Sequence, residues 1–215
     1  MTVETNGRSY EHRDPRTFAE VFDGICGNVR RAIRGKDDVI ALTVTCLVAR
    51  GHLLLEDVPG VGKTSLSKAL ARSIDADFRR VQFTPDLLRE VDHDRVLAQL
   101  RPVATAEDVL ALGEAAERVY VADALVAYLV DLAQRSREAS MLRLGVSPRA
   151  VLGLLRAARV RAAADGREFV TPDDIKSLAV PVLAHRIVIG PDSRLSGLSP
   201  DEAVDELLAI TPVPG

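Results

Sequence analysis

Hydrophobic residues recur every three or four positions along most of this chain, which is the spacing of one face of a helix. This pattern predicts a first amphipathic helix over residues 17–34, ended by Gly35. It predicts a second helix over residues 39–50, capped at its start by Asp37 or Asp38. Residues 1–16, which are polar and mixed in charge, are expected to form a flexible N-terminal tail.

The periodicity changes after the second helix. Residues 52–55 (His-Leu-Leu-Leu) form a short apolar run, which predicts a buried strand. A turn containing proline and glycine follows, and a helical pattern then extends from Lys63 to Ile74. Residues 78–84 alternate well enough to predict a second strand. The first part of the chain, residues 17–100, is therefore expected to be an α/β domain.

Beyond Thr84 the pattern is helical almost throughout. Three helix starts share one signature, a hydroxyl N-cap followed by proline at the first helical position: Ser147-Pro148, Thr171-Pro172 and Ser199-Pro200. Residues 187–189 (Ile-Val-Ile) fit either a short strand or an extended link. Residues 104–215 are therefore expected to form a separate all-helical domain.

The turn after the first predicted strand has the residue types of a phosphate-binding loop. Glycines at this turn let the backbone aim successive N–H groups at phosphate oxygens, and the following helix adds the positive end of its dipole. Lys63 would supply a charge for the β- and γ-phosphates, and the Thr64 hydroxyl would be a ligand of Mg²⁺. The predicted nucleotide-binding residues are Pro59, Gly60, Val61, Gly62, Lys63, Thr64 and Ser65.

One residue departs from the motif, and one simpler interpretation competes with it. A strict motif has glycine at position 57, and this chain has Asp57, whose side chain at a strand end can point away from the phosphates. The alternative is a simple turn that joins a strand to a helix. Such a turn has no need of Gly-Lys-Thr at the helix start, so the phosphate loop is favoured.

Composition excludes several other classes. The net charge of −3 and pI near 5.8 argue against a nucleic-acid-binding protein driven by bulk charge. Cys26 and Cys46 lie in apolar helical patterns without metal-ligand spacing and are expected to be reduced core thiols. No signal sequence is recognised, and the longest apolar run, residues 39–49, is too short for a bilayer. We therefore expect a soluble, cytoplasmic protein, with residues 92–94 (Asp-His-Asp) forming a solvated helix face rather than a metal site.

With these residues in place, the chain resembles the MoxR family of AAA+ ATPases. The resemblance is carried by the segments GHLLLEDVPGVGKTSLSKALA (51–71), FRRVQFTPDLL (78–88), RVYVADALVAYLVDL (118–132), LGVSPRAVLGLLRAAR (144–159) and GREFVTPDDIKSLAVPVLAHRIV (166–188). It implies an α/β P-loop NTPase core followed by an all-α helical lid, with ATP and Mg²⁺ as cofactors. It also implies homo-oligomeric rings, or rings with intact MoxR-type subunits, that remodel proteins as chaperones do and work with partners carrying von Willebrand A domains. The lid arginine of the family, sensor 2, corresponds to Arg149, which is therefore predicted to act catalytically at the γ-phosphate beside Lys63.

The chain departs from the family in the middle of the predicted core. After Leu88 it lacks the apolar strand ending in Asp-Glu (Walker B), the sensor 1 strand and the arginine finger. Its Asp-Glu pairs, Asp201-Glu202 and Asp205-Glu206, both lie in the last predicted helix, the first of them at its start. The core is thus expected to be incomplete, with ATP binding retained and hydrolysis impaired. The loop strand is also expected to have open edges. The alternative function is a non-enzymatic helical module that binds ring subunits or their partners. A small P-loop kinase is disfavoured, because we find no acceptor-site acid and no second arginine cluster near a lid.

Overall fold

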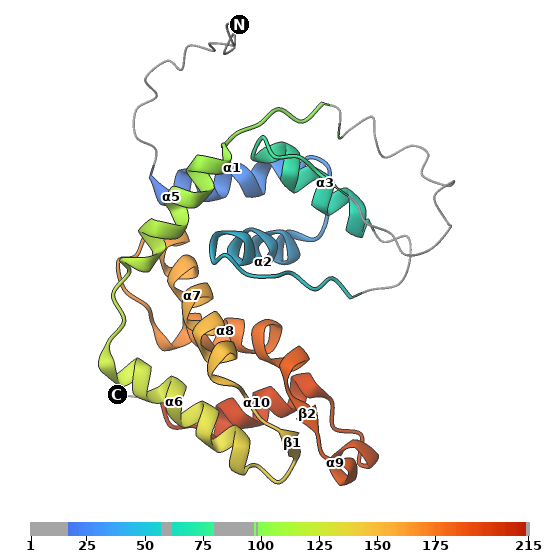
Figure 1. Ribbon diagram of the computed structural model, residues 1–215, viewed down its shortest axis with the longest axis vertical. Helices are drawn as coiled ribbons and strands as arrows, with labels where there is room; N and C mark the ends of the chain where they lie inside the picture. The colour runs from blue at the N-terminus through green and yellow to red at the C-terminus, as the bar shows by residue number, and fades with distance from the viewer. Residues whose placement is uncertain (1–16, 57–61, 80–96, 98, 214–215) are drawn as a thin grey trace, which may run out of the picture.

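The helices of the computed structural model pack around two hydrophobic clusters. In Figure 1 the helices of the first cluster lie above those of the second. The structure describes residues 17–56, 62–79, 97 and 99–213. Its elements in chain order are α1 (Phe18–Arg30), α2 (Asp37–Val48), α3 (Lys63–Ser73), α5 (Ala106–Glu117), α6 (Asp123–Glu138), β1 (Leu142–Leu144), α7 (Pro148–Ala164), α8 (Pro172–Leu183), the 3₁₀ turn η1 (Ala184–Arg186), β2 (Val188–Ile189), α9 (Pro191–Leu195) and α10 (Pro200–Ile210).

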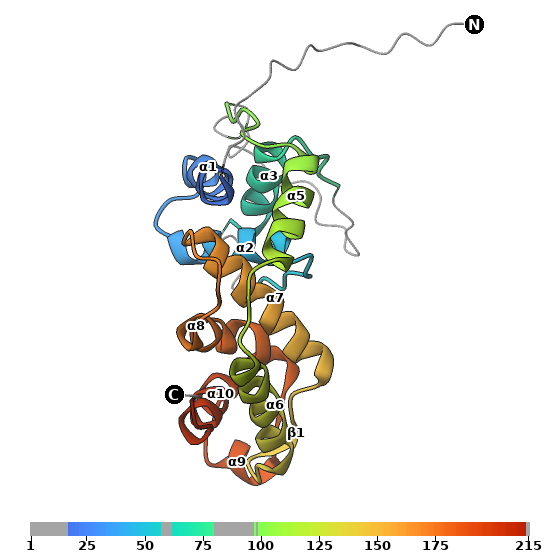
Figure 2. The same cartoon turned by 90° about the vertical axis from the view of Figure 1, so that its left-hand side faces the viewer.

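The first cluster joins α1, α2, α3 and α5 through buried aliphatic side chains such as Ile25, Ile40 and Leu112. The second joins α6, α7, α8 and α10 around Leu129 and Leu154. Helix α7 belongs to both, because its residue Val160 is buried in the first cluster. Figures 1 and 2 show α7 running from the lower half of the molecule to the upper half.

The predicted boundary between the α/β domain and the helical domain, at residues 100–104, stays a prediction. The change from the first hydrophobic cluster to the second occurs further along the chain. Ala116, near the end of α5, belongs to the first cluster, and Val119 belongs to the second. Helix α5 therefore belongs to the first cluster together with α1, α2 and α3, whereas the periodicity groups it with the helical part of the chain. Its apolar face covers α2 and α1.

The helix starts read from hydroxyl-proline pairs are confirmed. Ser147, Thr171 and Ser199 are the N-caps of α7, α8 and α10, and each side chain accepts a hydrogen bond from a backbone N–H in the first turn. Thr17 caps α1 in the same way. These caps satisfy N–H groups that would otherwise lack a partner at the helix ends.

The predicted cap of α2 is wrong. Lys36 occupies the N-cap position, and both Asp37 and Asp38 lie within the first turn. Asp37 instead pairs with Arg30 of α1, with 2.8 Å between its Oδ1 and the arginine Nε. An acid in the first turn still stabilises the helix, because its charge lies near the positive end of the helix dipole. The acidic residues thus mark the start of α2 correctly, but the N-cap is one position earlier than predicted.

The predicted strand at residues 52–55 is also wrong. Residues 51–56 have no regular secondary structure, and Leu53 and Leu54 are 45% and 59% exposed. A strand needs hydrogen-bonded neighbours, and the sheet found among the described residues is the two-stranded antiparallel pair of β1 and β2. The strand option for residues 187–189 is thus confirmed by β2. The second predicted strand, residues 78–84, lies outside the described residues from position 80 onward.

The two cysteines are free thiols, as expected. Cys26 is buried in the first cluster, and this burial raises its pKa to about 11. Cys46 is only partly buried, and burial raises its pKa as well. Neither thiol is therefore a ready nucleophile at neutral pH. Among the described residues, no helix has both the length and the apolar character needed to cross a membrane.

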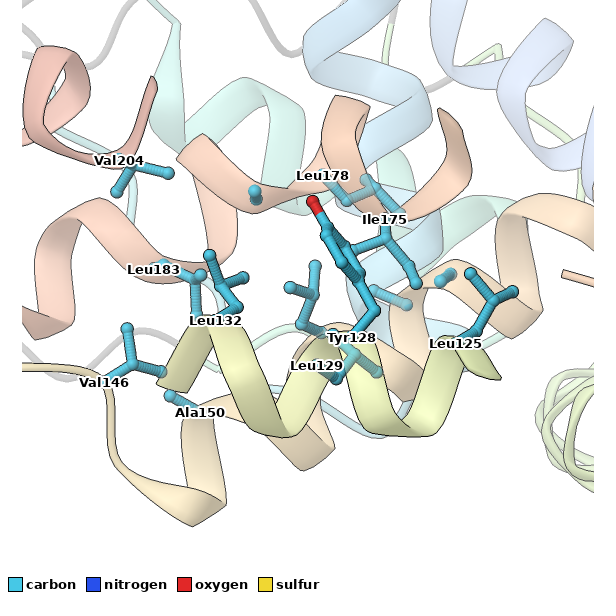
Figure 3. Packing of buried hydrophobic residues seen from close by; sticks show 14 of the residues in the cluster. Leu125, Tyr128, Leu129, Leu132, Val146, Ala150, Ile175, Leu178, Leu183 and Val204 are labelled. Atoms are coloured by element: carbon cyan, nitrogen blue, oxygen red, sulfur yellow. The ribbon is translucent and has the colours of Figure 1, made fainter. Parts of the chain in front are cut away.

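One buried hydroxyl in the second cluster has no hydrogen-bond partner. Tyr128 is 3% exposed, and its ring lies against Leu178 and Ile175 in Figure 3, with its Oη among apolar side chains. Burial also raises the pKa of this phenol, since the neutral form is favoured there. A buried, unpartnered polar atom costs about 1–3 kcal/mol of stability.

We therefore expect Tyr128→Phe to stabilise the protein by about 1 kcal/mol, which is a rise in Tm of about 2–4 °C for a chain of this size. Thermal unfolding followed by circular dichroism measures the change. Tyr120→Phe is the matched control, because Tyr120 is 65% exposed and should leave Tm unchanged. A lower Tm for Tyr128→Phe would mean that the hydroxyl has an acceptor.

Candidate functional site

The candidate site is the start of α3. Gly62 is the N-cap residue and has φ of +91°, in the left-handed region that residues with a Cβ rarely adopt. Lys63 is the first helical residue, and the Leu66 N–H donates to the Gly62 carbonyl at 2.9 Å to close the first turn. No side chain caps this helix, in contrast to the starts of α1, α5, α7, α8 and α10. A helix start of this kind presents backbone N–H groups and the positive end of the helix dipole, which suit an anion.

The other end of α3 is fixed by a buried polar network. The Asn28 side-chain amide of α1 donates to the Ser73 hydroxyl at 3.1 Å and to the Arg101 carbonyl at 2.9 Å. The Ser73 hydroxyl donates in turn to the Ala69 carbonyl at 2.7 Å. Leu66 is buried in the first cluster on the inner face of the same helix. The helix is therefore anchored along its length and at its C-terminus, while its N-terminus stays accessible.

The structure places four of the residues predicted to bind nucleotide, Gly62 and the three that follow it, at the start of α3. Lys63, Thr64 and Ser65 occupy the first turn of α3, directly after Gly62, and all of them are partly exposed. Such a turn presents an ammonium group, two hydroxyls and the positive end of a helix dipole at one place, which suits a phosphate group. The Thr64 hydroxyl is also an oxygen ligand of the kind that Mg²⁺ takes. The predicted residues Pro59, Gly60 and Val61 lie outside the described residues.

The structure does not bring Arg149 to this turn. Arg149 is exposed in the first turn of α7, which follows β1. In both Figure 1 and Figure 2, β1 and α3 lie at opposite ends of the molecule. Within one chain, the predicted sensor arginine and the start of α3 are therefore separate.

No alternative metal site competes with this one in the part of the chain that the structure describes. Those residues include no group of three or more histidine, cysteine, aspartate or glutamate side chains that could hold an ion. The Asp-His-Asp sequence at residues 92–94 lies outside the described residues.

Two family models match the chain. Residues 52–123 match the ATPase family associated with various cellular activities (AAA), and residues 134–207 match the AAA lid domain. The first match begins ahead of the glycine loop and includes α3 and α5. The second match includes α7, α8 and most of α10, which form the lower part of the molecule in Figure 1 together with α6. The order of core and lid is therefore the one that the sequence predicted.

Two curated relatives align over most of the chain. The uncharacterized protein YeaC of Bacillus subtilis is 27% identical over 297 residues, covering 87% of this chain and 93% of the relative. The Chaperone MoxR1 of Mycobacterium tuberculosis is 24% identical over 303 residues, covering 86% of this chain and 80% of the relative. Each alignment is longer than the 215 residues of the chain, so each relative contains internal segments that have no counterpart here.

The fold has a counterpart among solved structures. A protein from Cytophaga hutchinsonii, solved by crystallography at 2.00 Å resolution, superimposes with a TM-score of 0.80 at 19% identity. The superposition covers 92% of this chain and 96% of the other. This likeness concerns the fold: a truncated α/β core of the AAA+ type, followed by a helical lid.

Proposed function

This chain belongs to the MoxR-like AAA+ ATPases and is shortened within its α/β core, and we propose that it binds ATP and Mg²⁺ at the start of α3. The observation that carries the proposal is the left-handed Gly62 leading directly into Lys63 and Thr64 at a helix start without a side-chain cap. Lys63 would pair with the β- and γ-phosphates, and Thr64 would hold Mg²⁺. The bound Mg²⁺ would neutralise charge on the phosphate oxygens.

We also propose that this chain hydrolyses ATP slowly by itself. Its sequence contains no apolar strand ending in Asp-Glu after the glycine loop, so the usual carboxylate pair beside Mg²⁺ has no equivalent. It also lacks the segment that would carry an arginine finger. In related nucleotide hydrolases such an arginine is worth about 10³–10⁵ in rate. Nucleotide binding and nucleotide turnover are therefore separable in this protein.

The experiment is a titration of the purified chain with ATP and Mg²⁺, in which binding and phosphate release are read from the same samples. Saturable binding with little release supports the proposal. The alternative, a non-enzymatic helical module that binds ring subunits or their partners, is supported by the well-packed second cluster. That alternative predicts that ATP does not bind at all.

For Arg149 we propose a role toward a neighbouring subunit. Arg149 is exposed in the first turn of α7, shortly after β1, and Figures 1 and 2 show β1 at the end of the molecule opposite α3. We propose that it reaches the nucleotide of another chain in a ring. The neighbour would be a second copy or an intact MoxR-type subunit. As the name of the mycobacterial relative includes the word chaperone, we propose remodelling of partner proteins in the cytoplasm as the output, with a von Willebrand A-domain protein as a partner that the family implies.

Arg149→Ala is accordingly expected to leave the Kd for ATP of the isolated chain within about twofold, since the residue contacts no nucleotide in its own subunit. It should reduce ATP-dependent association of subunits, measured by analytical ultracentrifugation. Arg118→Ala, which removes another exposed arginine, is the control and should change neither. If Arg149→Ala weakened ATP binding by the monomer tenfold or more, the arginine would act within its own chain.

A further inference from the structure

A second positively charged site lies away from α3, where the end of α2 meets α5 and α7 (Figure 1). It is a cavity of about 120 Å³. Val48 and Val160 form an apolar part of its wall, and Arg50, Arg156 and Arg159 line it together with Glu117. The cavity includes no residue of the predicted phosphate loop.

Arg50 reaches this cavity from an unusual backbone position. It follows the C-cap of α2 with φ of +53°, in the left-handed region, where glycine is the usual residue. The Arg50 N–H donates to the Leu47 carbonyl at 3.0 Å, and the Gly51 N–H donates to the Cys46 carbonyl at 2.8 Å. These two bonds form a Schellman motif. The left-handed position of this motif, which is usually a glycine, is occupied here by Arg50, and the only glycine nearby in the sequence, Gly51, follows it. An arginine at such a position suggests that its side chain has a function.

The packing of α5 brings the Arg50 side chain close to that helix. A Cβ at Gly113 would lie 3.3 Å from the Arg50 Nε and 3.1 Å from the Val48 carbonyl oxygen. The absence of a side chain at Gly113 therefore lets the guanidinium lie along α5, at the cavity wall.

The three arginines carry no compensating partner within the part of the chain that the structure describes. None of the ion pairs there involves Arg50, Arg156 or Arg159, and Glu117 is not within ion-pair distance of them. The Nε of Arg159 is buried and has no hydrogen-bond acceptor. A buried donor without an acceptor is unfavourable, and it is more so beside two other cations. An anion in the cavity would relieve both costs.

The size and chemistry of the cavity define the anion. Guanidinium groups present planar forks of donors that match phosphate oxygens in pairs. The cavity has room for one phosphate group, and it opens to solvent beside the exposed residues Arg50, Arg156 and Glu117, so an anion can enter it. We propose that this cavity binds a small oxyanion of the phosphate class through Arg50, Arg156 and Arg159. The anion bridges α2, α5 and α7, and so ties the lid helix to the first cluster.

This site does not depend on nucleotide binding at α3, and the experiment keeps the two apart. The host is the Lys63→Ala variant, in which the phosphate loop is impaired. Its thermal unfolding is followed as inorganic phosphate is added at constant ionic strength, with chloride as the balancing salt. The expected result is a saturable rise in Tm of about 2–4 °C that chloride does not produce.

Variants of the arginines identify the site. Arg159→Ala should abolish the response to phosphate, whereas Arg161→Ala should retain it, because Arg161 lies on the same helix but pairs with Asp165. Arg50→Gly tests the site without harming the fold, since glycine accepts the φ of this position without strain. It should keep the Tm measured without phosphate and lose most of the response.

A second arm replaces inorganic phosphate with O-phosphoserine. A response to phosphate alone identifies a free ion as the ligand, and an equal response to both identifies a phosphoryl group on a larger molecule. The proposal is overturned if phosphate fails to raise Tm above the chloride control. It is equally overturned if Arg159→Ala and Arg50→Gly respond as the host does.

Discussion

Lys63→Ala is expected to weaken ATP binding about 10- to 150-fold. The loss corresponds to one charge-assisted interaction, worth about 1.5–3 kcal/mol, between the ammonium and the phosphates. Lys63 is the first residue of α3 and follows the left-handed Gly62, so its position is fixed by the backbone turn. The backbone N–H groups of the helix start remain in the variant, and for this reason we expect weakened binding and not a complete loss.

Isothermal titration calorimetry with ATP and Mg²⁺ measures this change. The matched control is Arg72→Ala, which removes one positive charge from the last turn of the same helix. Arg72 is at the end of α3 away from the glycine, so its loss should alter the Kd by less than about threefold. Equal Kd values for Lys63→Ala and the unchanged chain would place the nucleotide elsewhere and refute the proposed site.

The loss of Arg167 is expected to cost about 3 kcal/mol of folding stability, the largest stability effect predicted for a charged residue here. Its guanidinium donates to both carboxylate oxygens of Asp174, at 2.6 and 2.7 Å. Asp174 is 4% exposed and also accepts from the Thr171 N–H at 2.8 Å, as the partner in the capping box of α8. Arg167→Ala would leave this carboxylate buried without a cation, which typically costs about 3–5 kcal/mol.

The same pair predicts a dependence on pH. Burial would raise the pKa of Asp174, but hydrogen bonds from Arg167 and Thr171 outweigh it and hold the pKa below its usual value. A carboxyl group with a lowered folded pKa adds stability at pH above its unfolded pKa of about 3.9. That contribution is lost as pH falls through the folded pKa. In Arg167→Ala burial still raises the pKa of Asp174, while the strongest opposing hydrogen bond is gone, so the folded pKa is higher in the variant than in the unchanged chain. The difference in stability between the two proteins should therefore be full at neutral pH and shrink as pH falls through the interval between these two folded pKa values.

Urea unfolding at a series of pH values from neutral to acid measures this difference. Arg161→Ala is the control, because the Arg161–Asp165 pair spans 3.5 Å with both side chains about half exposed. Exposed pairs contribute about 0–1 kcal/mol, so this variant should differ little from the parent at any pH. A difference between Arg167→Ala and the parent that stayed constant down to strong acid would show that Asp174 is not the group that Arg167 stabilises.

Local signals in the sequence predicted the helical part well. The caps at Ser147, Thr171 and Ser199 depend on residues within three positions of one another, so the sequence contains the whole interaction. The start of α3 was also predicted from local sequence, because the left-handed conformation that Gly62 adopts and the helix start at Lys63 depend on adjacent residues. The family resemblance was confirmed for the same reason: its motifs are short and contiguous.

Features that depend on distant parts of the chain were missed. The apolar run at Leu53 and Leu54 has strand character, but a strand forms only beside a neighbour, and nothing local reports whether one exists. The cap of α2 was placed one position too late, and the ion pair that Asp37 forms with Arg30, seven positions away, was not foreseen. Nothing in the sequence predicted the arginine-lined cavity. Arg50 and Arg159 are far apart in the chain and come together only because α7 packs on α2.

The burial of Val160 in the first cluster has a consequence for motion of the lid. The connection between α5 and α6 is short, and it would ordinarily be the hinge about which a lid turns. Here α7 crosses that boundary, so rotation at the connection alone would pull Val160 out of its apolar surroundings, at a cost of about 1.5–3 kcal/mol. The angle between the two halves is therefore set by a continuous helix, and any large swing must bend α7 or carry α5 along with it.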